Sequence, residues 1–193
     1  MAVRLQLNEN NGIFFITFTC LHWLPLFEIT NSYDVVYKWF DYLNSKGHYV
    51  NGFVIMPNHL HALIGLKNSD QSINTIVSNA KRFMAYEIVK RLKEQQQNNV
   101  LEKLSSAVNA SDSKRGKLHQ VFEPSFDCKE CYSEAFTEQK LSYMHENPCK
   151  GTWDLAVSPI NYKHSSAKYY LTGENGEYAV TNYKELMDVD LSK

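Results

Sequence analysis

Two histidines one residue apart could hold a metal ion. They are His59 and His61, and they open the apolar run HLHALIGL. A β-strand points alternate side chains to one face, so the two imidazoles would project together. Two imidazoles on a rigid strand can bind one divalent metal ion when a third ligand arrives from another part of the fold. The pattern is short, and taken alone it also fits ordinary histidines near the edge of a sheet.

A second candidate segment lies in a helical pattern near residue 145. In a helical register Tyr143 and Asn147 occupy one face, four residues apart. Taken alone, a tyrosine on an amphipathic helix usually packs into a core, and an asparagine before a proline usually caps the helix. His145 lies about 200 degrees round the helix from Tyr143, so it is left outside the site. The histidine pair and this segment together favour a functional site more than either does alone.

Hydrophobic spacing predicts the strands that carry the histidines. The run from Ile13 to Cys20 is β-branched and aromatic, which is typical of a buried strand. Two apolar runs, from Tyr49 to Met56 and from His59 to Leu66, flank Pro57-Asn58. This pair suits a tight hairpin because proline fixes one turn dihedral and asparagine tolerates unusual ones. A short strand is also expected from His119 to Phe122.

Apolar residues at helical spacing predict three helices. The first runs from Ser32 to about Ser45. The second runs from Ser72 to about Glu94, with apolar residues on one side and much of the positive charge on the other. The third runs from Ser133 to Asn147, with Ser133 as N-cap. Pro148 ends it, because the residue before a proline is pushed away from helical geometry.

The length and composition predict a single domain. The chain has 193 residues, of which 44% are hydrophobic and 13% aromatic, enough for one well-buried core. We expect a domain over residues 1–175 and a C-terminal tail over 176–193. Residues 95–118 are polar and are expected to form a mobile insertion, with a helical turn around Leu101 to Leu104. The order of elements predicts an α+β sandwich with a central antiparallel sheet and helices packed on it.

Two classes of protein are disfavoured by the composition. No apolar run approaches the roughly 18 residues of a membrane span, and Met1 to Arg4 lacks the apolar core of a secretory signal. A cytoplasmic protein is therefore expected, with no membrane partner. The four cysteines are too sparse for a secreted disulfide framework. Cys128 and Cys131 have the spacing of half a zinc site, but no second close Cys/His pair lies near them in the sequence.

The net charge of -1 makes no overall electrostatic case for binding nucleic acid. Any such contact must therefore be local. Lys81 and Arg82 on the second predicted helix are the first candidates for contact with a phosphate backbone. Lys114, Arg115 and Lys117 in a polar loop are weaker candidates. A solvated surface explains either group equally well.

Four blocks of the chain match the pattern of a known family. They are FFITFT followed by Leu26-Phe27, then VIMPNHLH, then VFEPSFD, and finally YMHENP followed by Lys150-Gly151 and Ser165-Ser166. In order and spacing they cover most of positions 13 to 170. With them the chain resembles the REP-associated tyrosine transposases, which are HUH single-strand DNA transposases of the insertion-sequence-200-like kind.

The resemblance implies roles for four residues. His59 and His61 would be the metal-ligating pair of a His-hydrophobic-His motif, Tyr143 the nucleophile, and Asn147 the third ligand of a Mg²⁺ or Mn²⁺ ion. A phenol has an unperturbed pKa of about 10, so it needs a nearby cation or base at neutral pH. The ion would polarise the scissile phosphate. Attack would form a 5′-phosphotyrosine link to DNA and release a 3′ hydroxyl.

The resemblance also implies a fold and a partner. The fold would be ferredoxin-like, of the HUH type, and the partner single-stranded DNA or an imperfect DNA hairpin, including repeated palindromes. The protein would be a monomer or a homodimer. The long polar insertion departs from the family pattern, as does Phe122 where a tryptophan is common. Two alternatives stay open: a noncatalytic hairpin-binding module, and a zinc-stabilised interaction domain held by Cys128, Cys131 and two histidines.

Overall fold

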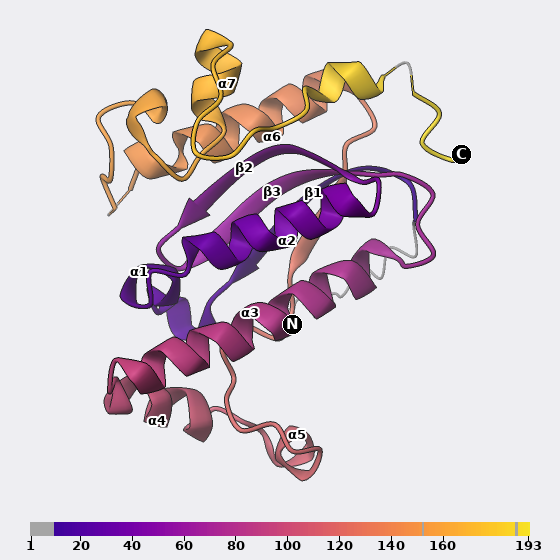
Figure 1. Cartoon of the computed structure of the whole chain (residues 1–193). Helices are drawn as coiled ribbons and strands as arrows, with labels where there is room; N and C mark the ends of the chain where they lie inside the picture. Colours follow the sequence, from indigo (N-terminus) through magenta and orange to yellow (C-terminus); the bar gives the residue numbers. More distant parts are fainter. Residues whose placement is uncertain (1–9, 152, 188) are drawn as a thin grey trace.

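A four-stranded antiparallel sheet forms the centre of the structure, a computed structural model that describes residues 10–151, 153–187 and 189–193 (Figure 1). The strands lie side by side in the order β2-β3-β1-β4. The predicted α+β architecture is confirmed, and β2 and β3 form the hairpin that the apolar runs predicted. The strands are β1 (Gly12–Thr19), β2 (Tyr49–Met56), β3 (His59–Leu66) and β4 (Asp127–Glu130).

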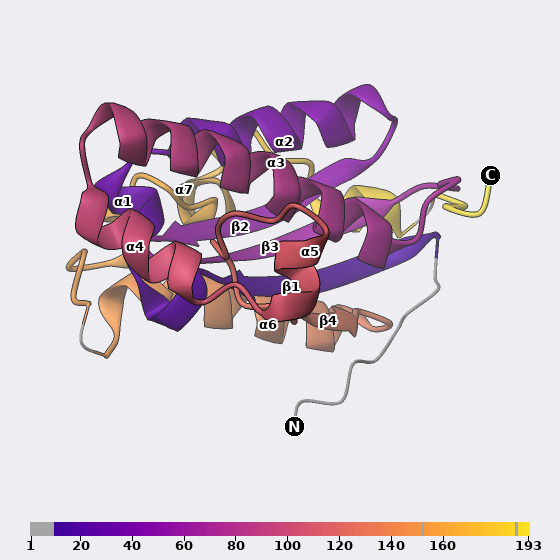
Figure 2. The same ribbon diagram turned by 90° about the horizontal axis from the view of Figure 1, so that it is seen from below.

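Helices cover both faces of the sheet (Figure 1 and Figure 2). One face carries α2 (Tyr33–Ser45) and α3 (Ile73–Glu94), and the other carries α6 (Glu134–Glu146) and α7 (Ala167–Thr172). The three predicted helices are confirmed as α2, α3 and α6. The remaining helical segments are η1 (Leu21–Trp23), α1 (Leu26–Ile29), α4 (Asn98–Ser106), α5 (Ala110–Lys114), η2 (Asn147–Cys149), η3 (Pro159–Asn161) and η4 (Tyr183–Leu186).

The sheet separates two hydrophobic clusters. Phe14, Ile16 and Phe18 of β1 pack with α2 and α3, whereas Phe15 packs with α6. This alternation follows from the period of two residues in a strand. Both faces of the sheet are covered, so β2 and β3 are apolar almost throughout and buried.

The prediction of a strand from His119 to Phe122 is wrong. The fourth strand is β4, which pairs with β1. Val121 and Phe122 are both buried in the cluster beneath α2 and α3, whereas neighbouring side chains of a strand point to opposite faces of the sheet. Phe122 makes only an isolated bridge with Cys20 in the described chain, and its ring packs against Phe18 with centroids 5.3 Å apart.

The polar segment 95–118 contains two helices, α4 and α5, instead of the single helical turn that was expected. Leu104 is fully buried in the core next to α3, and Val100 and Leu101 pack against the same cluster. Three apolar side chains at helical spacing are therefore enough to fasten α4 to the domain. The C-terminal segment also packs on the domain, because Tyr183 and Leu186 are buried. None of the described helices is long and apolar enough to span a membrane.

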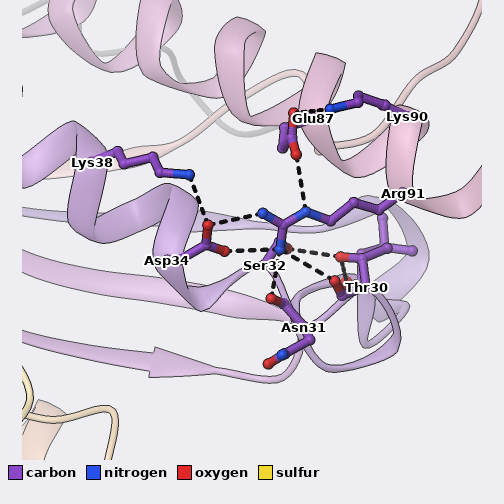
Figure 3. Close-up of polar contacts among 9 residues, drawn as sticks. Thr30, Asn31, Ser32, Asp34, Lys38, Glu87, Lys90 and Arg91 are labelled. Atoms are coloured by element: carbon purple, nitrogen blue, oxygen red, sulfur yellow. Dashed lines mark hydrogen bonds and ion pairs between the residues drawn. The ribbon is translucent and has the colours of Figure 1, made fainter. Parts of the chain in front are cut away.

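Arg91 links α3 to α2 (Figure 3). Its guanidinium donates two parallel hydrogen bonds to the carboxylate of Asp34, each 2.8 Å long. Its Nε donates to Glu87 at 3.1 Å, and Nη1 donates to the carbonyl of Asn31 at 2.6 Å. This basic residue of α3 therefore holds two helices together. Hydrogen bonding to Arg91 lowers the pKa of Asp34 to about 2.

Asp34→Asn should destabilise the fold at pH 7 and have less effect in acid. The pKa of Asp34 is about 2 in the folded chain against an ordinary 3.8. Its contribution is therefore fully present above about pH 4 and is lost as the pH falls through about 2. Because the carboxylate is half exposed, we expect a loss of only about 1 kcal/mol at pH 7.

Urea unfolding of the wild type and Asp34→Asn across this pH range measures the difference. Lys38→Gln is the matched control, because it removes the more exposed partner of the same carboxylate, 2.9 Å away, and should cost less. An Asp34→Asn effect of equal size at about pH 7 and about pH 2 would contradict the assignment.

Candidate active site

The two histidines lie on β3 between β2 and β1. In the register with β1, His61 is opposite Thr17 and His59 is opposite Thr19. Both imidazoles are buried, and their centroids are 4.8 Å apart. The strand therefore does bring the two rings together on the face covered by α6.

Each imidazole is oriented by a hydrogen bond at its Nδ1 atom. His59 Nδ1 lies 2.6 Å from Asn58 Oδ1, and His61 Nδ1 lies 2.6 Å from Thr17 Oγ1. A carboxamide oxygen only accepts, so Nδ1 of His59 donates and its Nε2 keeps a lone pair. The Thr17 hydroxyl can accept from His61 in the same way. Such partners at Nδ1 are what orients an imidazole that binds a metal through Nε2.

The protonation state of the pair suits a metal site. Burial lowers the pKa of His59 to about 4. Burial, together with the charges of His59 and Lys140, lowers the pKa of His61 to about 3. Both rings are therefore neutral at pH 7. Nε2 of His61 is buried and has no hydrogen-bond partner within the described residues. A neutral imidazole with an unpartnered lone pair is the form that binds a divalent metal, so the pair fits one.

Helix α6 brings Tyr143 to this pair. The Tyr143 ring meets His61 with centroids 5.3 Å apart and planes at 71°. Phe15 supports both rings, because it stacks on His61 at 5.5 Å and meets Tyr143 edge-on at 6.3 Å. Tyr143 is 54% exposed, and its hydroxyl makes no hydrogen bond within the part of the chain that the structure describes. The phenol thus lies beside a buried imidazole and stays open to solvent.

Asn147 follows α6 directly and is half buried. Within residues 10–151, 153–187 and 189–193, no hydrogen bond joins its side chain to either imidazole, so its role as third ligand stays a prediction. The same residues contain no group of three or more His, Cys, Asp or Glu side chains that could hold a metal ion. A metal on the pair would therefore need oxygen ligands from an amide, water or a phosphate.

His145 lies outside the site, as its helical position predicts. Its Nε2 is 2.8 Å from Ser166 Oγ, and its ring packs against Tyr170 with centroids 5.5 Å apart. Ser166 also accepts a hydrogen bond from the backbone N–H of Phe53 at 2.9 Å. His145 therefore fastens α6 to β2 and takes no part in the imidazole pair.

Lys140 is a charged neighbour of the site that the sequence analysis missed. Its Nζ lies 5.2 Å from the ring centroid of Phe15 and 6.0 Å from that of Tyr143. The position three residues before Tyr143 on the same helix could have revealed it. An ammonium group held over aromatic rings places positive charge beside the phenol.

Gly52 allows α6 to approach the sheet closely. A Cβ atom at this position would lie 2.7 Å from Leu141 Cδ2 and 3.1 Å from Met144 Cε, which real Cβ atoms do not tolerate without movement of the neighbours. Leu141 and Met144 flank Tyr143 on α6, and both are buried. The missing side chain at Gly52 thus leaves room for Leu141 and Met144 of α6 against β2.

The two basic segments predicted as separate candidates meet at one groove. The groove has a volume of about 900 Å³, with α3 forming one wall and residues 115–124 the other. Arg82 lines one wall, and Arg115 and Lys117 line the other, whereas Lys114 is not part of the lining. Two glutamates share the lining with six basic residues, so positive charge predominates. The basic residues are Lys81, Arg82, Lys90, Lys93, Arg115 and Lys117.

Lys81 has a structural role in this groove. Its ammonium donates to the carbonyls of Glu123, Pro124 and Ser125 at 2.7, 3.4 and 3.2 Å. These bonds fasten segment 123–125 to α3.

Cys128 and Cys131 belong to different hydrophobic clusters. Cys128 packs in the cluster beneath α2 and α3, and Cys131 packs in the cluster beneath α6. Burial raises the pKa of Cys128 to about 12 and that of Cys131 to about 11, so both stay protonated at neutral pH. This placement argues against a zinc ion shared by both thiols and the two histidines.

Comparisons with known proteins bear on the fold. No family model and no curated protein sequence matches the chain. A solved structure of a REP-associated tyrosine transposase bound to a REP hairpin is similar over 94% of this chain and 100% of its own, with 15% identity and a TM-score of 0.57. A candidate transposase from Deinococcus radiodurans R1 matches 70% of this chain and 90% of its own, with 12% identity and a TM-score of 0.38, too weak a likeness to argue from. The chain therefore has the fold of the REP-associated tyrosine transposase, in agreement with the resemblance indicated by its four motifs.

Proposed function

We propose that this chain is a metal-dependent DNA strand transferase that cleaves and rejoins single-stranded or hairpin DNA through Tyr143. The observation that carries the proposal is the contact between the exposed Tyr143 ring and the buried His61, whose Nε2 has no partner within the described residues. The shared fold with a transposase supports it. A phenol next to two neutral imidazoles is an arrangement suited to phosphoryl transfer.

The reaction uses one nucleophile, and the covalent intermediate conserves the energy of the cleaved phosphodiester bond. The Tyr143 oxygen attacks the phosphorus of a phosphodiester, and the bond from phosphorus to the 3′ oxygen breaks. The phenol loses its proton to solvent, and the leaving 3′ oxygen takes one up. The product is a 5′-phosphotyrosine and a free 3′ hydroxyl. Because one phosphodiester replaces another, attack by a 3′ hydroxyl reverses the step without a nucleotide cofactor.

His59 and His61 would hold a Mg²⁺ or Mn²⁺ ion through their Nε2 atoms, with Asn147 as third ligand. Such an ion polarises a phosphate and stabilises the charge that develops on it. Asn58 and Thr17 keep the two imidazoles in the binding orientation through their Nδ1 atoms. The ammonium of Lys140, 6.0 Å from the centroid of the Tyr143 ring, would attract the phosphate toward the phenol.

The basic groove is the best surface for the DNA backbone. The structural neighbour was solved bound to a REP hairpin, and the groove of this chain concentrates six basic residues. Contacts to phosphates supply most of the affinity for a duplex stem, and they carry little sequence information. We therefore place a hairpin stem between α3 and residues 115–124.

Replacing both Arg82 and Arg115 with alanine should weaken hairpin binding for every stem sequence alike. Each arginine that contacts a phosphate contributes about one unit to the slope of log affinity against log salt. Fluorescence titration at several salt concentrations should therefore show a slope smaller by about two. Lys114→Ala, at the last residue of α5 and next to Arg115 but outside the groove lining, is the matched control. An unchanged slope of log affinity against log salt in the double variant would show that the DNA backbone does not bind in the groove.

The proposed activity is tested with a labelled hairpin and Mn²⁺. A denaturing gel should show a protein-linked DNA band in the wild type, and EDTA should abolish that band. Hairpin binding without any linked band would favour the noncatalytic binding module instead. Absence of both binding and linkage would reject the DNA function altogether.

A further inference from the structure

The turn that follows β1 has an unusual backbone. His22 and Trp23 are consecutive and have φ angles of 51° and 57°. Residues other than glycine rarely adopt this left-handed conformation. Such strain persists where the surroundings hold it, and it concentrates at functional sites.

Hydrogen bonds with three other residues hold the turn in place. The backbone N–H of Trp23 donates to the carbonyl of Cys20 at 3.1 Å, and that of His22 donates to the Glu123 carboxylate at 2.8 Å. The side chain of Asn58 donates from Nδ2 to the Trp23 carbonyl at 3.2 Å. Its Oδ1 atom accepts from Nδ1 of His59 at 2.6 Å. One carboxamide thus ties the position of Trp23 to the orientation of a candidate metal ligand.

The turn presents the Trp23 indole beside the histidine pair. Trp23 is 62% exposed, although large aromatic side chains are usually mostly buried. The indole meets the His59 imidazole with centroids 5.7 Å apart and planes at 74°. The contact is nearly perpendicular and the side chain is largely exposed, so the indole keeps ring surface that a base could stack on. Ring contacts continue from His59 to His61 and from His61 to Tyr143, which places Trp23 at the end of a row that leads to the phenol.

The same turn lies next to the basic groove. Glu123 lines the groove and accepts from His22. The backbone N–H of Leu21 donates to the carbonyl of Val121, another lining residue, at 2.8 Å. The groove is on the side of α3, and Tyr143 is on the side of α6, so a DNA strand that joins them must pass round an end or edge of the sheet. The turn at the end of β1 lies between the two.

We propose that Trp23 is a stacking platform for one unpaired base of the DNA strand that runs from the hairpin stem to Tyr143. The proposal rests on the proposed function and extends it, because it identifies the ligand as a hairpin with a single-stranded flank. Bases of any identity stack on an exposed aromatic ring, so the platform holds the strand with little sequence preference. Trp23 acts as a positioning residue that presents the adjoining phosphate to the histidine pair.

The proposal is tested by affinity measured in EDTA, so that no metal or catalysis is needed. Two probes are compared, an imperfect hairpin that carries a short single-stranded flank and the same hairpin with blunt ends. Trp23→Ala should bind the flanked hairpin about 5- to 150-fold more weakly than the wild type, the loss expected for one stacked base. Its affinity for the blunt hairpin should be unchanged, and Trp23→Phe should restore most of the loss. Tyr42→Ala removes a half-exposed aromatic ring from α2 and should affect neither probe.

A second test uses hairpins from whose single-stranded flank one base at a time has been removed. With the wild type, removal of one particular flank base should weaken binding as much as Trp23→Ala does, and Trp23→Ala should be insensitive to that removal. Equal affinity of Trp23→Ala and wild type for the flanked hairpin would overturn the proposal, as would equal losses on both probes. If Trp23→Ala fails to fold, a wild type indifferent to every abasic position overturns it too. Failure of the proposed function would show separately, as a wild type that binds the flanked hairpin and forms no linked product with Mn²⁺.

Discussion

Replacing Tyr143 with phenylalanine should abolish covalent attachment to DNA and leave the fold intact. The ring contacts with His61 and Phe15 involve the aromatic system, which phenylalanine retains. The hydroxyl makes no hydrogen bond within the described residues, so its loss leaves no buried group unsatisfied. What disappears is the oxygen that would attack the phosphorus. We expect no protein-linked band on a denaturing gel and a hairpin affinity within about twofold of the wild type, since the phenol supplies no phosphate contact of its own.

Tyr132→Phe is the matched control for this experiment. Tyr132 is 81% exposed and stacks on Phe136 near the start of α6, so it shares the helix region and the exposure of Tyr143 without the histidine contact. Its variant should keep the full yield of linked DNA. A linked band of wild-type intensity from Tyr143→Phe would show that another residue attacks the phosphorus and that Tyr143 is not the nucleophile.

His61→Ala should remove both metal binding and strand cleavage. His61 is the imidazole with a buried, unpartnered Nε2 and the contact to Tyr143. Loss of one of two imidazole ligands should lower the yield of linked DNA by at least about 100-fold, beyond the effect of losing an outer-sphere partner. Addition of Mn²⁺ should raise the unfolding temperature of the wild type, because a ligand that binds only the folded state stabilises it. The same addition should leave His61→Ala unchanged.

His48→Gln is the control for His61→Ala, because it removes a buried imidazole that is not a candidate metal ligand. His48 is buried, and its Nδ1 accepts a hydrogen bond from the backbone N–H of Lys67 at 3.3 Å, far along the hairpin from the site. This variant should keep the Mn²⁺-dependent rise in unfolding temperature and form linked DNA. A His61→Ala protein that still responds to Mn²⁺ and still forms linked DNA would show that the pair binds no essential metal.

Local sequence was sufficient for the elements on which the site is built. The strand from His59 to Leu66 and the hairpin before it appear as predicted, because both apolar runs are buried on both faces and are bounded by a turn pair with its own conformational preference. Ser133 accepts a hydrogen bond from the N–H of Phe136 at 3.3 Å and so starts α6 where a cap residue was expected. These features depend on neighbours within a few residues.

Features that depend on distant contacts were missed or misplaced. The fourth strand was expected at residues 119–122, but edge pairing with β1 selects Asp127–Glu130. The polar segment 95–118 contains α4 because Leu104 finds a space in the core that no local pattern reveals. The groove was overlooked for the same reason, since α3 and residues 115–124 must meet to form it.

The sequence by itself determined that two imidazoles would share one face of a strand, and that a tyrosine and an asparagine would lie a turn apart on a later helix. Strand and helix periods alone require this. Only the tertiary structure decided that the phenol meets His61, that Thr17 and Asn58 orient the pair, and that Gly52 lets the helix come close enough. The reason is that packing between segments far apart in the chain depends on the shapes of both surfaces, and no local period encodes those shapes.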